Sequence, residues 1–165
     1  MKFFDRDWLT GELTDTEYEA RFEKYYAHFD LIRVALPQSL VDLSESGVLH
    51  DALVEVVQVD SGHGRLVVEL LGGYLQAGYR ALHLRYDGME LDDASRITLE
   101  QATLDPATEF LYGELDLRSD GRFEHRMLLW PYREVSVCFR AFDIVSIDRP
   151  TRQRRPGTPK YIEIR

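Results

Sequence analysis

Residues 52–71 read ALVEVVQVDSGHGRLVVELL, and this stretch decides the class of fold. Residues 52–59 are rich in β-branched side chains, which favour an extended backbone. Residues 60–64 supply the Asp, Ser and Gly that are typical of a turn, and residues 65–71 return to an apolar run. The stretch therefore predicts a β-hairpin with which a sheet begins.

Later segments extend this sheet. Leu82, Leu84 and Tyr86 alternate with other side chains, which predicts a third strand. Residues 89–107 show little periodicity, so we expect a long connection there with one helical turn. Further strands are expected within residues 114–147. The sequence thus predicts a mainly antiparallel β-meander of about six strands over residues 52–147.

Side-chain pairing predicts the register of the hairpin that contains residues 114–126. A three-residue loop at Ser119–Gly121 pairs Leu115 with His125 and makes one face of the hairpin apolar. The same register pairs Glu114 with Arg126 on the other face. A two-residue loop would mix apolar and charged residues on both faces, so we expect the longer loop.

The same test applies to the hairpin that follows. A loop at Pro131–Arg133 pairs Leu129 with Val135 and Met127 with Val137. These pairs are apolar, which favours this register. It also places His125 beside Phe139.

The region before the sheet has the pattern of amphipathic helices. Thr14 and Glu17 have the spacing of a capping box, which predicts the start of a helix. After Glu17, aromatic and aliphatic residues recur every three or four positions to about residue 34, and we expect this stripe to pack in the core. Pro37 then suits the first turn of a second, short helix. Residues 1–47 are therefore predicted to be helical.

Length and charge divide the chain in two. The 165 residues have the size of one domain, with 44% hydrophobic residues and a formal net charge of −9. Residues 149–165 contain six basic residues and one acidic residue, a charge of +5 that leaves −14 for the rest. We expect one α+β domain over residues 1–148 and a basic tail rich in Pro and Arg, with an edge strand at Tyr161–Ile164.

Composition also bears on partners and compartment. An acidic domain repels phosphate backbones, so we expect no DNA binding by residues 1–148 and a protein partner of basic character. No run approaches the roughly 18 apolar residues of a membrane span, and charged residues interrupt the N-terminus. Cys138 is the only cysteine, which fits a reducing compartment. The chain is expected to be cytoplasmic.

An acid, an imidazole and a guanidinium follow one another at Glu124-His125-Arg126. Alternation separates them, because His125 faces the apolar side and its neighbours face the other side. These three residues therefore cannot form a compact acid/base cluster by themselves. An aromatic residue and an Arg are typical anchors of a protein-recognition face. The predicted face consists of Tyr112, Glu114, Asp116, Glu124, Arg126 and Trp130. The structural alternative is a buried His125 bonded to a neighbour, with a cross-strand ion pair.

Two other functions remain open. His50 and Asp51 can act as an oriented base or as two ligands of a metal site, and a small metal-assisted hydrolase would need one further histidine. The aromatic stripe of the first long helix can instead line a small-ligand site between helix and sheet. No cofactor motif occurs in the sequence.

Two motifs carry a resemblance to a known group. Residues 49–52 read LHDA and residues 123–131 read FEHRMLLWP. Over residues 49–142 the chain resembles an uncharacterised family of small bacterial proteins with a domain of unknown function. Related small α+β proteins are suspected immunity or interaction proteins, so the resemblance implies a bacterial binding protein of immunity-like type. It implies no catalytic residues.

Overall fold

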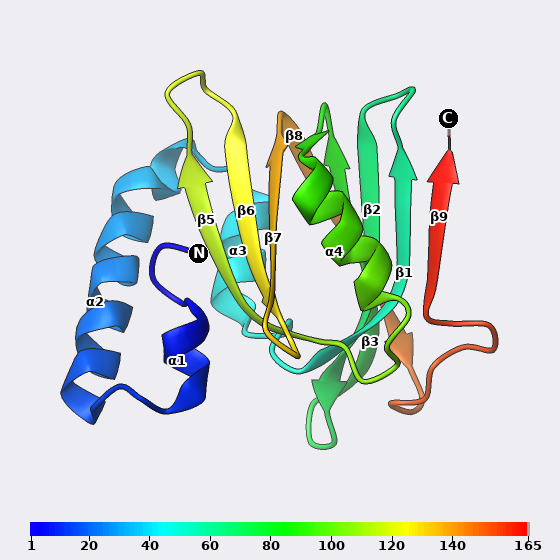
Figure 1. Ribbon diagram of the computed structural model, residues 1–165, viewed down its shortest axis with the longest axis horizontal. Coiled ribbons are helices and arrows are strands. Elements are labelled where there is room, and N and C mark those ends of the chain that lie inside the picture. The colour runs from blue at the N-terminus through cyan, green and yellow to red at the C-terminus, as the bar shows by residue number, and fades with distance from the viewer. Residues whose placement is uncertain (165) are drawn as a thin grey trace.

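The computed structural model describes residues 1–164, and every side chain among them except that of Leu9. It has an α+β fold in which helices precede and flank a mostly antiparallel sheet (Figure 1). The helices are α1 (Arg6–Thr10), α2 (Asp15–Ile32), the 3₁₀ helix η1 (Arg33–Ala35), α3 (Gln38–Ser46) and α4 (Asp93–Ala102). The strands are β1 (Ala52–Asp60), β2 (Arg65–Tyr74), β3 (Gly78–Asp87), β4 (Glu90–Leu91), β5 (Glu109–Leu117), β6 (Phe123–Leu129), β7 (Arg133–Phe139), β8 (Ala141–Arg149) and β9 (Lys160–Ile164). The predicted fold class is confirmed, but the sheet of residues 1–164 has nine strands instead of about six.

α2 begins at the predicted capping box. The Thr14 hydroxyl accepts the N–H of Glu17, and the Glu17 carboxylate accepts the N–H of Thr14 at 2.8 Å. The helix buries Tyr25 and Phe29, but Tyr26 is 58% exposed, so the expected core stripe is only partly buried. The second predicted helix is α3. Among residues 1–164, no helix combines the length and the apolar character needed to cross a membrane.

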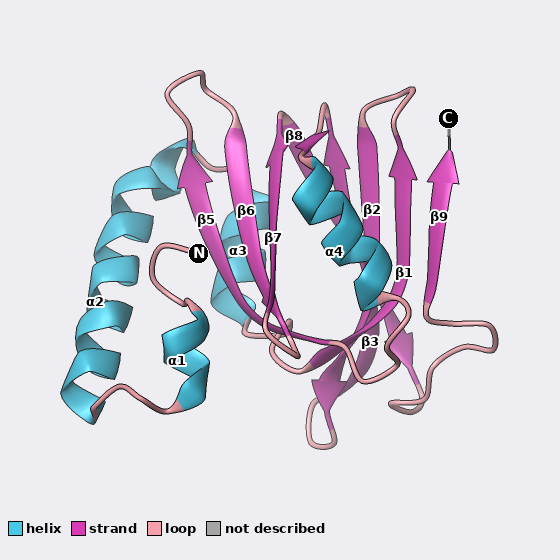
Figure 2. Ribbon diagram, viewed as in Figure 1, coloured by secondary structure: helices cyan, strands magenta, loops and turns pink. Residues whose placement is uncertain are grey.

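The sheet has an irregular centre at β1. The strand order is β4-β7-β6-β5-β1-β2-β3-β8, and β9 pairs with β1 in parallel. β5 pairs with β1 only at Ala52 and Leu53, whereas β9 pairs with β1 from Val56 to Asp60. The rest of β5 therefore has β6 on one side and, within the described chain, no strand on the other. α2 lies alongside this free edge (Figure 2), which is one of the ways in which proteins protect an edge strand.

The register predicted for the first of the two later hairpins is confirmed. Leu115 pairs with His125 and Glu114 pairs with Arg126 across β5 and β6. The apolar face so formed packs in the core.

The register predicted for the second of these hairpins is wrong. Met127 pairs with Val135 rather than with Val137, and His125 lies opposite Val137 rather than beside Phe139. The difference is a shift of two residues. Since such a shift keeps every side chain on its own face, the alternation of apolar and polar residues does not distinguish the two registers.

α4 replaces most of the connection expected at residues 89–107. It has ten residues instead of one turn, and Asp92 caps it by accepting the N–H of Ser95 at 2.6 Å. Leu99 and Ala102 are buried, while Ile97 is exposed. The narrow apolar face explains why periodicity did not indicate a helix.

The basic tail returns along the sheet. Its predicted edge strand is present as β9. Glu55 on β1 is fully buried, accepts the main-chain N–H of Arg155 at 3.0 Å and lies 3.5 Å from the guanidinium of Arg149. A buried carboxylate needs hydrogen bonds and opposite charges to offset the loss of its hydration. The tail supplies these to Glu55 and so stabilises the sheet. Arg165, the last residue of the predicted tail, lies outside the described residues.

Candidate functional site

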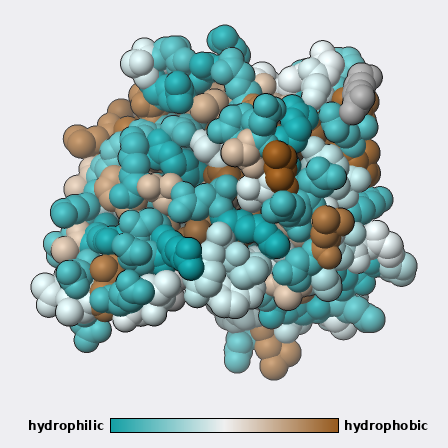
Figure 3. All heavy atoms as spheres, in the orientation of Figure 1, coloured by the Kyte–Doolittle hydropathy of each residue, from teal (hydrophilic) through white to brown (hydrophobic). Residues whose placement is uncertain are grey.

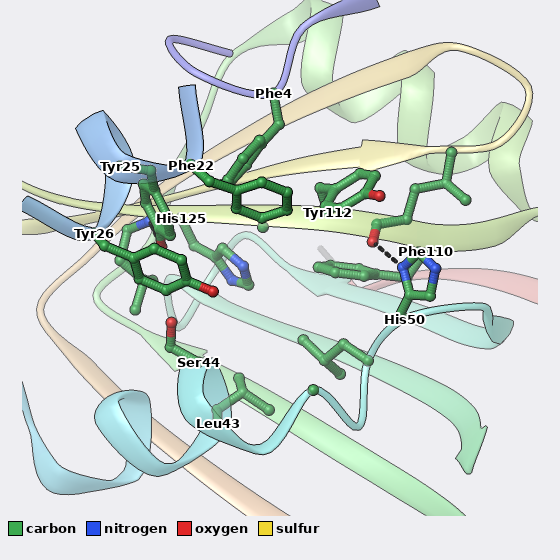
Figure 4. Close-up of a pocket in the computed structure, with 15 residues that line it drawn as sticks. Phe4, Phe22, Tyr25, Tyr26, Leu43, Ser44, His50, Phe110, Tyr112 and His125 are labelled. Carbon is green, nitrogen blue, oxygen red and sulfur yellow. Dashed lines mark hydrogen bonds between the residues drawn. The ribbon is translucent and has the colours of Figure 1, made fainter. Parts of the chain in front are cut away.

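A cavity of about 370 Å³ lies where α2, α3 and the free edge of β5 meet. Figure 4 shows aromatic side chains from α2 and from β5 arranged around it. Its volume falls in the range of roughly 300–1,000 Å³ that is usual for small-molecule sites. The wall consists of Phe4, Phe22, Tyr25, Tyr26, Leu43, Ser44, Gly47, Leu49, His50, Phe110, Leu111, Tyr112, Gly113, Leu115 and His125.

α2 supplies one wall through Phe22, Tyr25 and Tyr26, which share a helical face because they are three and four positions apart. The Tyr25 hydroxyl accepts the N–H of Leu115 at 3.3 Å and so takes up a main-chain donor on the free edge of β5. Burial raises the pKa of Tyr25, so this phenol keeps its proton. The bond holds the helix at a fixed distance from the strand.

Phe4 closes a second side of the pocket and is held there by Glu114. The Glu114 carboxylate is fully buried and accepts the main-chain N–H groups of Lys2 at 2.8 Å, Phe3 at 2.7 Å and Phe4 at 2.7 Å. The Phe4 ring lies 5.0 Å from the Trp8 ring and is itself 3% exposed. Glu114 thus holds the main chain of residues 2–4 over β5.

Gly113 and His125 meet at the floor of the pocket. A Cβ atom on residue 113 would lie 2.7 Å from His125 Nε2 and 3.0 Å from Phe110 Cζ, so the two rings approach the strand as closely as only glycine permits. An isolated glycine inside a strand, here between Tyr112 and Glu114, indicates such an approach. The sequence therefore contains a signal for this site in addition to those described above.

His125 is 2% exposed, and its Nδ1 lies 2.8 Å from the Tyr86 hydroxyl. Burial lowers the pKa of His125 to about 4, so the imidazole is neutral at pH 7. Burial also raises the pKa of Tyr86, which keeps its hydroxyl protonated. A core histidine bonded to a neighbour, the structural alternative from the sequence, is what the structure contains.

The pocket is apolar apart from a few polar side chains. Among the residues that the structure describes, no Asp, Glu, Lys or Arg lines its wall. The polar side chains are those of His125, His50, Ser44 and the tyrosines. A largely apolar wall with few converging polar groups is the usual character of a ligand site.

The predicted recognition face is largely covered. Glu114 is fully buried and Asp116 is 7% exposed, so the expectation that they stand on an open face is wrong. Although burial by itself raises the pKa of Asp116, hydrogen bonds from Lys2 and Arg126 lower it to about 2. Arg126 also bonds to Glu124. These charges form an internal network beneath residues 1–4.

The rest of the predicted face lies apart from this network. Tyr112 lines the pocket, and Trp130 is 42% exposed at the turn between β6 and β7, with its ring 5.2 Å from that of Tyr132. The side of the molecule seen in Figure 3 is mostly hydrophilic, with scattered hydrophobic side chains. Single exposed apolar residues are ordinary on protein surfaces. Recognition of a basic protein partner stays a prediction.

Within the described residues, no third ligand lies beside His50 and Asp51, the predicted metal ligands. His50 Nδ1 donates to the carbonyl of Leu111 at 2.8 Å, and its Nε2 lies 3.6 Å from Asp51 Oδ1. His63 and His83 interact with other carboxylates elsewhere in the sheet. In the part of the chain that the structure describes, no three His, Cys, Asp or Glu side chains are grouped so that they could hold a metal ion. His50 instead takes up a carbonyl on the free edge of β5.

Comparison of the chain with known protein families, with curated proteins and with solved structures gave no match. The resemblance to an uncharacterised bacterial family therefore stays a prediction. What the pocket binds has to be inferred from its own geometry.

Proposed function

We propose that this chain binds a small, largely apolar molecule in the pocket between α2, α3 and β5. The observation that carries the proposal is a preformed cavity with a largely apolar wall that contains six Phe and Tyr rings, and with a neutral imidazole in its floor. Of the functions considered from the sequence, this is the small-ligand site between helix and sheet.

Fixed walls support the proposal because they reduce the cost of binding. Ordering a flexible side chain on binding costs about 0.5–1.5 kcal/mol. Here Tyr25 is held by the N–H of Leu115, and Phe4 is held by the hydrogen bond from its main-chain N–H to Glu114. Little of the free energy gained by burying an apolar ligand is then spent on arranging these walls.

The protonation state of His125 favours binding over acid/base catalysis. A general base works best when its pKa lies near the working pH. The pKa of His125 is about 4, and its bonded partner is a phenol instead of a carboxylate. The imidazole is therefore better suited to orienting a ligand than to removing a proton.

The proposal can be tested with N-phenylnaphthylamine, an uncharged dye that fluoresces strongly in apolar surroundings. We expect saturable binding to the unaltered chain. Ser44 is exposed on α3 at the mouth of the pocket, so Ser44→Trp should fold and place an indole across the entrance. This variant should bind the dye at least about tenfold more weakly, a change of roughly 1.4 kcal/mol.

Asp42→Trp is the matched control, because residue 42 is exposed on the same helix but does not line the pocket. It should bind the dye like the unaltered chain. Equal weakening in both variants, or no effect of Ser44→Trp, would show that the dye binds elsewhere. Thermal unfolding of both variants checks that each is folded.

A further inference from the structure

We infer that the ligand of this pocket is an uncharged, planar molecule that presents a hydrogen-bond acceptor to Nε2 of His125. This inference rests on the proposed function and names the class of ligand. A carbonyl oxygen or a ring nitrogen would be a suitable acceptor.

The bond between Tyr86 and His125 determines which ring nitrogen carries the proton. Within the described chain, His125 Nδ1 is the only hydrogen-bond partner of the Tyr86 hydroxyl. If Nδ1–H donated to Tyr86, both the phenol proton and the Nε2 lone pair would lack a partner. If the phenol donates to Nδ1, only the Nε2–H group is left over. The second arrangement leaves fewer buried polar groups unpaired and is therefore favoured.

Nε2 of His125 is directed at the pocket. A Cβ atom on Gly113 would lie 2.7 Å from Nε2, and both residues line the cavity. The close-up view shows the His125 ring pointing in among the aromatic side chains (Figure 4). The pocket floor therefore offers a hydrogen-bond donor, and the matching group on a ligand is an acceptor.

The wall argues against a charged ligand. It contains no acidic side chain, no lysine and no arginine, the imidazole in its floor is neutral at pH 7, and its second imidazole, that of His50, is already bonded to the carbonyl of Leu111. A charge moved from water into such surroundings loses its hydration without gaining an ionic partner. An uncharged ligand avoids this cost.

Aromatic rings on several sides favour a planar ligand. The rings of Phe22 and Tyr26 are stacked, with 14° between their planes, and the rings of Phe4 and Tyr112 lie 33° apart. Flat molecules can offset-stack or pack edge to face against such rings, at a gain of about 0.5–1.5 kcal/mol per ring pair beyond the buried area.

Three naphthalene derivatives of nearly equal shape test the inference: the methyl ketone, the isopropenyl compound and the carboxylate. Each would be measured by its displacement of N-phenylnaphthylamine. The ketone offers an acceptor, the isopropenyl compound offers none, and the carboxylate adds a charge. We expect the carboxylate to bind at least about tenfold more weakly than the ketone. A carboxylate that binds as tightly as the ketone would overturn the requirement for an uncharged ligand.

The role of His125 is tested with the double variant Tyr86→Phe/His125→Phe, which removes both partners of the buried bond and keeps an aromatic ring at each position. Replacing both partners by apolar groups of similar shape is often nearly neutral for stability. In this variant the affinity of the ketone relative to the isopropenyl compound should fall by about three- to tenfold. An unchanged ratio would overturn the inference. If Ser44→Trp still weakens dye binding, the proposed function stands.

A spectroscopic measurement serves if the double variant does not fold. The ¹⁵N spectrum of the unaltered chain should show His125 protonated at Nε2, and its signal should shift with the ketone but not with the isopropenyl compound. Protonation at Nδ1 instead, or equal shifts with both compounds, would contradict the inference. If neither the dye nor any of the three probes binds in the pocket, it is the proposed function that fails.

Discussion

His125 shows how much one residue contributes to both the core and the pocket. Alternation along the strand predicted that its ring faces the apolar side, and the structure confirms a burial that leaves it 2% exposed. Its partner Tyr86 was not predicted, because the two residues belong to β6 and β3, which are not neighbours in the sheet. A pair between distant strands depends on the strand order, and alternation within one strand does not reveal it.

The buried imidazole should make stability depend on pH. Its pKa is about 4 in the folded chain against an ordinary value of 6.5, so the unfolded chain takes up a proton first as the pH falls. The stability that the neutral ring contributes is complete above pH 6.5 and is lost as the pH falls toward 4. The loss should be about 3 kcal/mol. Urea unfolding between pH 7 and pH 4 measures it.

The double variant Tyr86→Phe/His125→Phe is the control, because it lacks this titrating group and keeps the other histidines. Its free energy of unfolding should fall less than that of the unaltered chain over the same pH range. Parallel losses in the two proteins would show that other groups cause the pH dependence.

At the scale of elements, β5 owes its position to groups that cover its free edge. The hydroxyl of Tyr25 and the imidazole of His50 take up a main-chain N–H and a carbonyl on this edge, while Glu114 fixes residues 2–4. Unpaired main-chain groups at an edge invite pairing with other chains. The cover provided by α2 and residues 2–4 both protects β5 and forms the walls of the pocket.

Glu114→Gln should loosen this cover. One carboxylate oxygen accepts the N–H groups of Phe3 and Phe4 and the other accepts that of Lys2, whereas an amide is uncharged, has a single acceptor oxygen and turns its NH₂ group toward one of these two sets of donors. We expect a loss of about 2–3 kcal/mol in the free energy of unfolding. Amide hydrogen exchange of Phe3 and Phe4 should become faster, and N-phenylnaphthylamine should bind more weakly because Phe4 lines the pocket.

Glu124→Gln is a suitable comparison. Glu124 bonds to Ser136 and Arg126 but to no main-chain group of residues 2–4. Its substitution should leave the exchange of Phe3 and Phe4 unchanged. If both variants exchange at the same rate as the unaltered chain, Glu114 does not anchor these residues.

Elements with strong local signals could be predicted from the sequence, and those with weak signals could not. The capping box at Thr14 and the apolar pairing of Leu115 with His125 are local, and the structure confirms both. α4 was missed because Ile97 is exposed and few apolar residues mark its buried face. The register predicted for β6 and β7 was wrong by two residues, and a shift of two residues preserves the alternation on which the prediction depended.

At the scale of the whole molecule, the pocket depends on contacts between distant segments. Its wall combines Phe4, a turn of α2, the end of α3, β5 and His125. The sequence indicated an aromatic face on the first long helix and a ligand site between helix and sheet as one option. It did not indicate which strand the helix would face, because the short pairing of β5 with β1 and the parallel pairing of β9 determine that arrangement.

The most direct test is an isotope-filtered NMR experiment on the chain with bound naphthyl methyl ketone. We expect nuclear Overhauser contacts between the naphthalene protons and the side chains of Phe22, Tyr26 and Phe110, all of which line the pocket. Contacts confined to the exposed rings of Trp130 and Tyr132, with none to the pocket, would contradict the account.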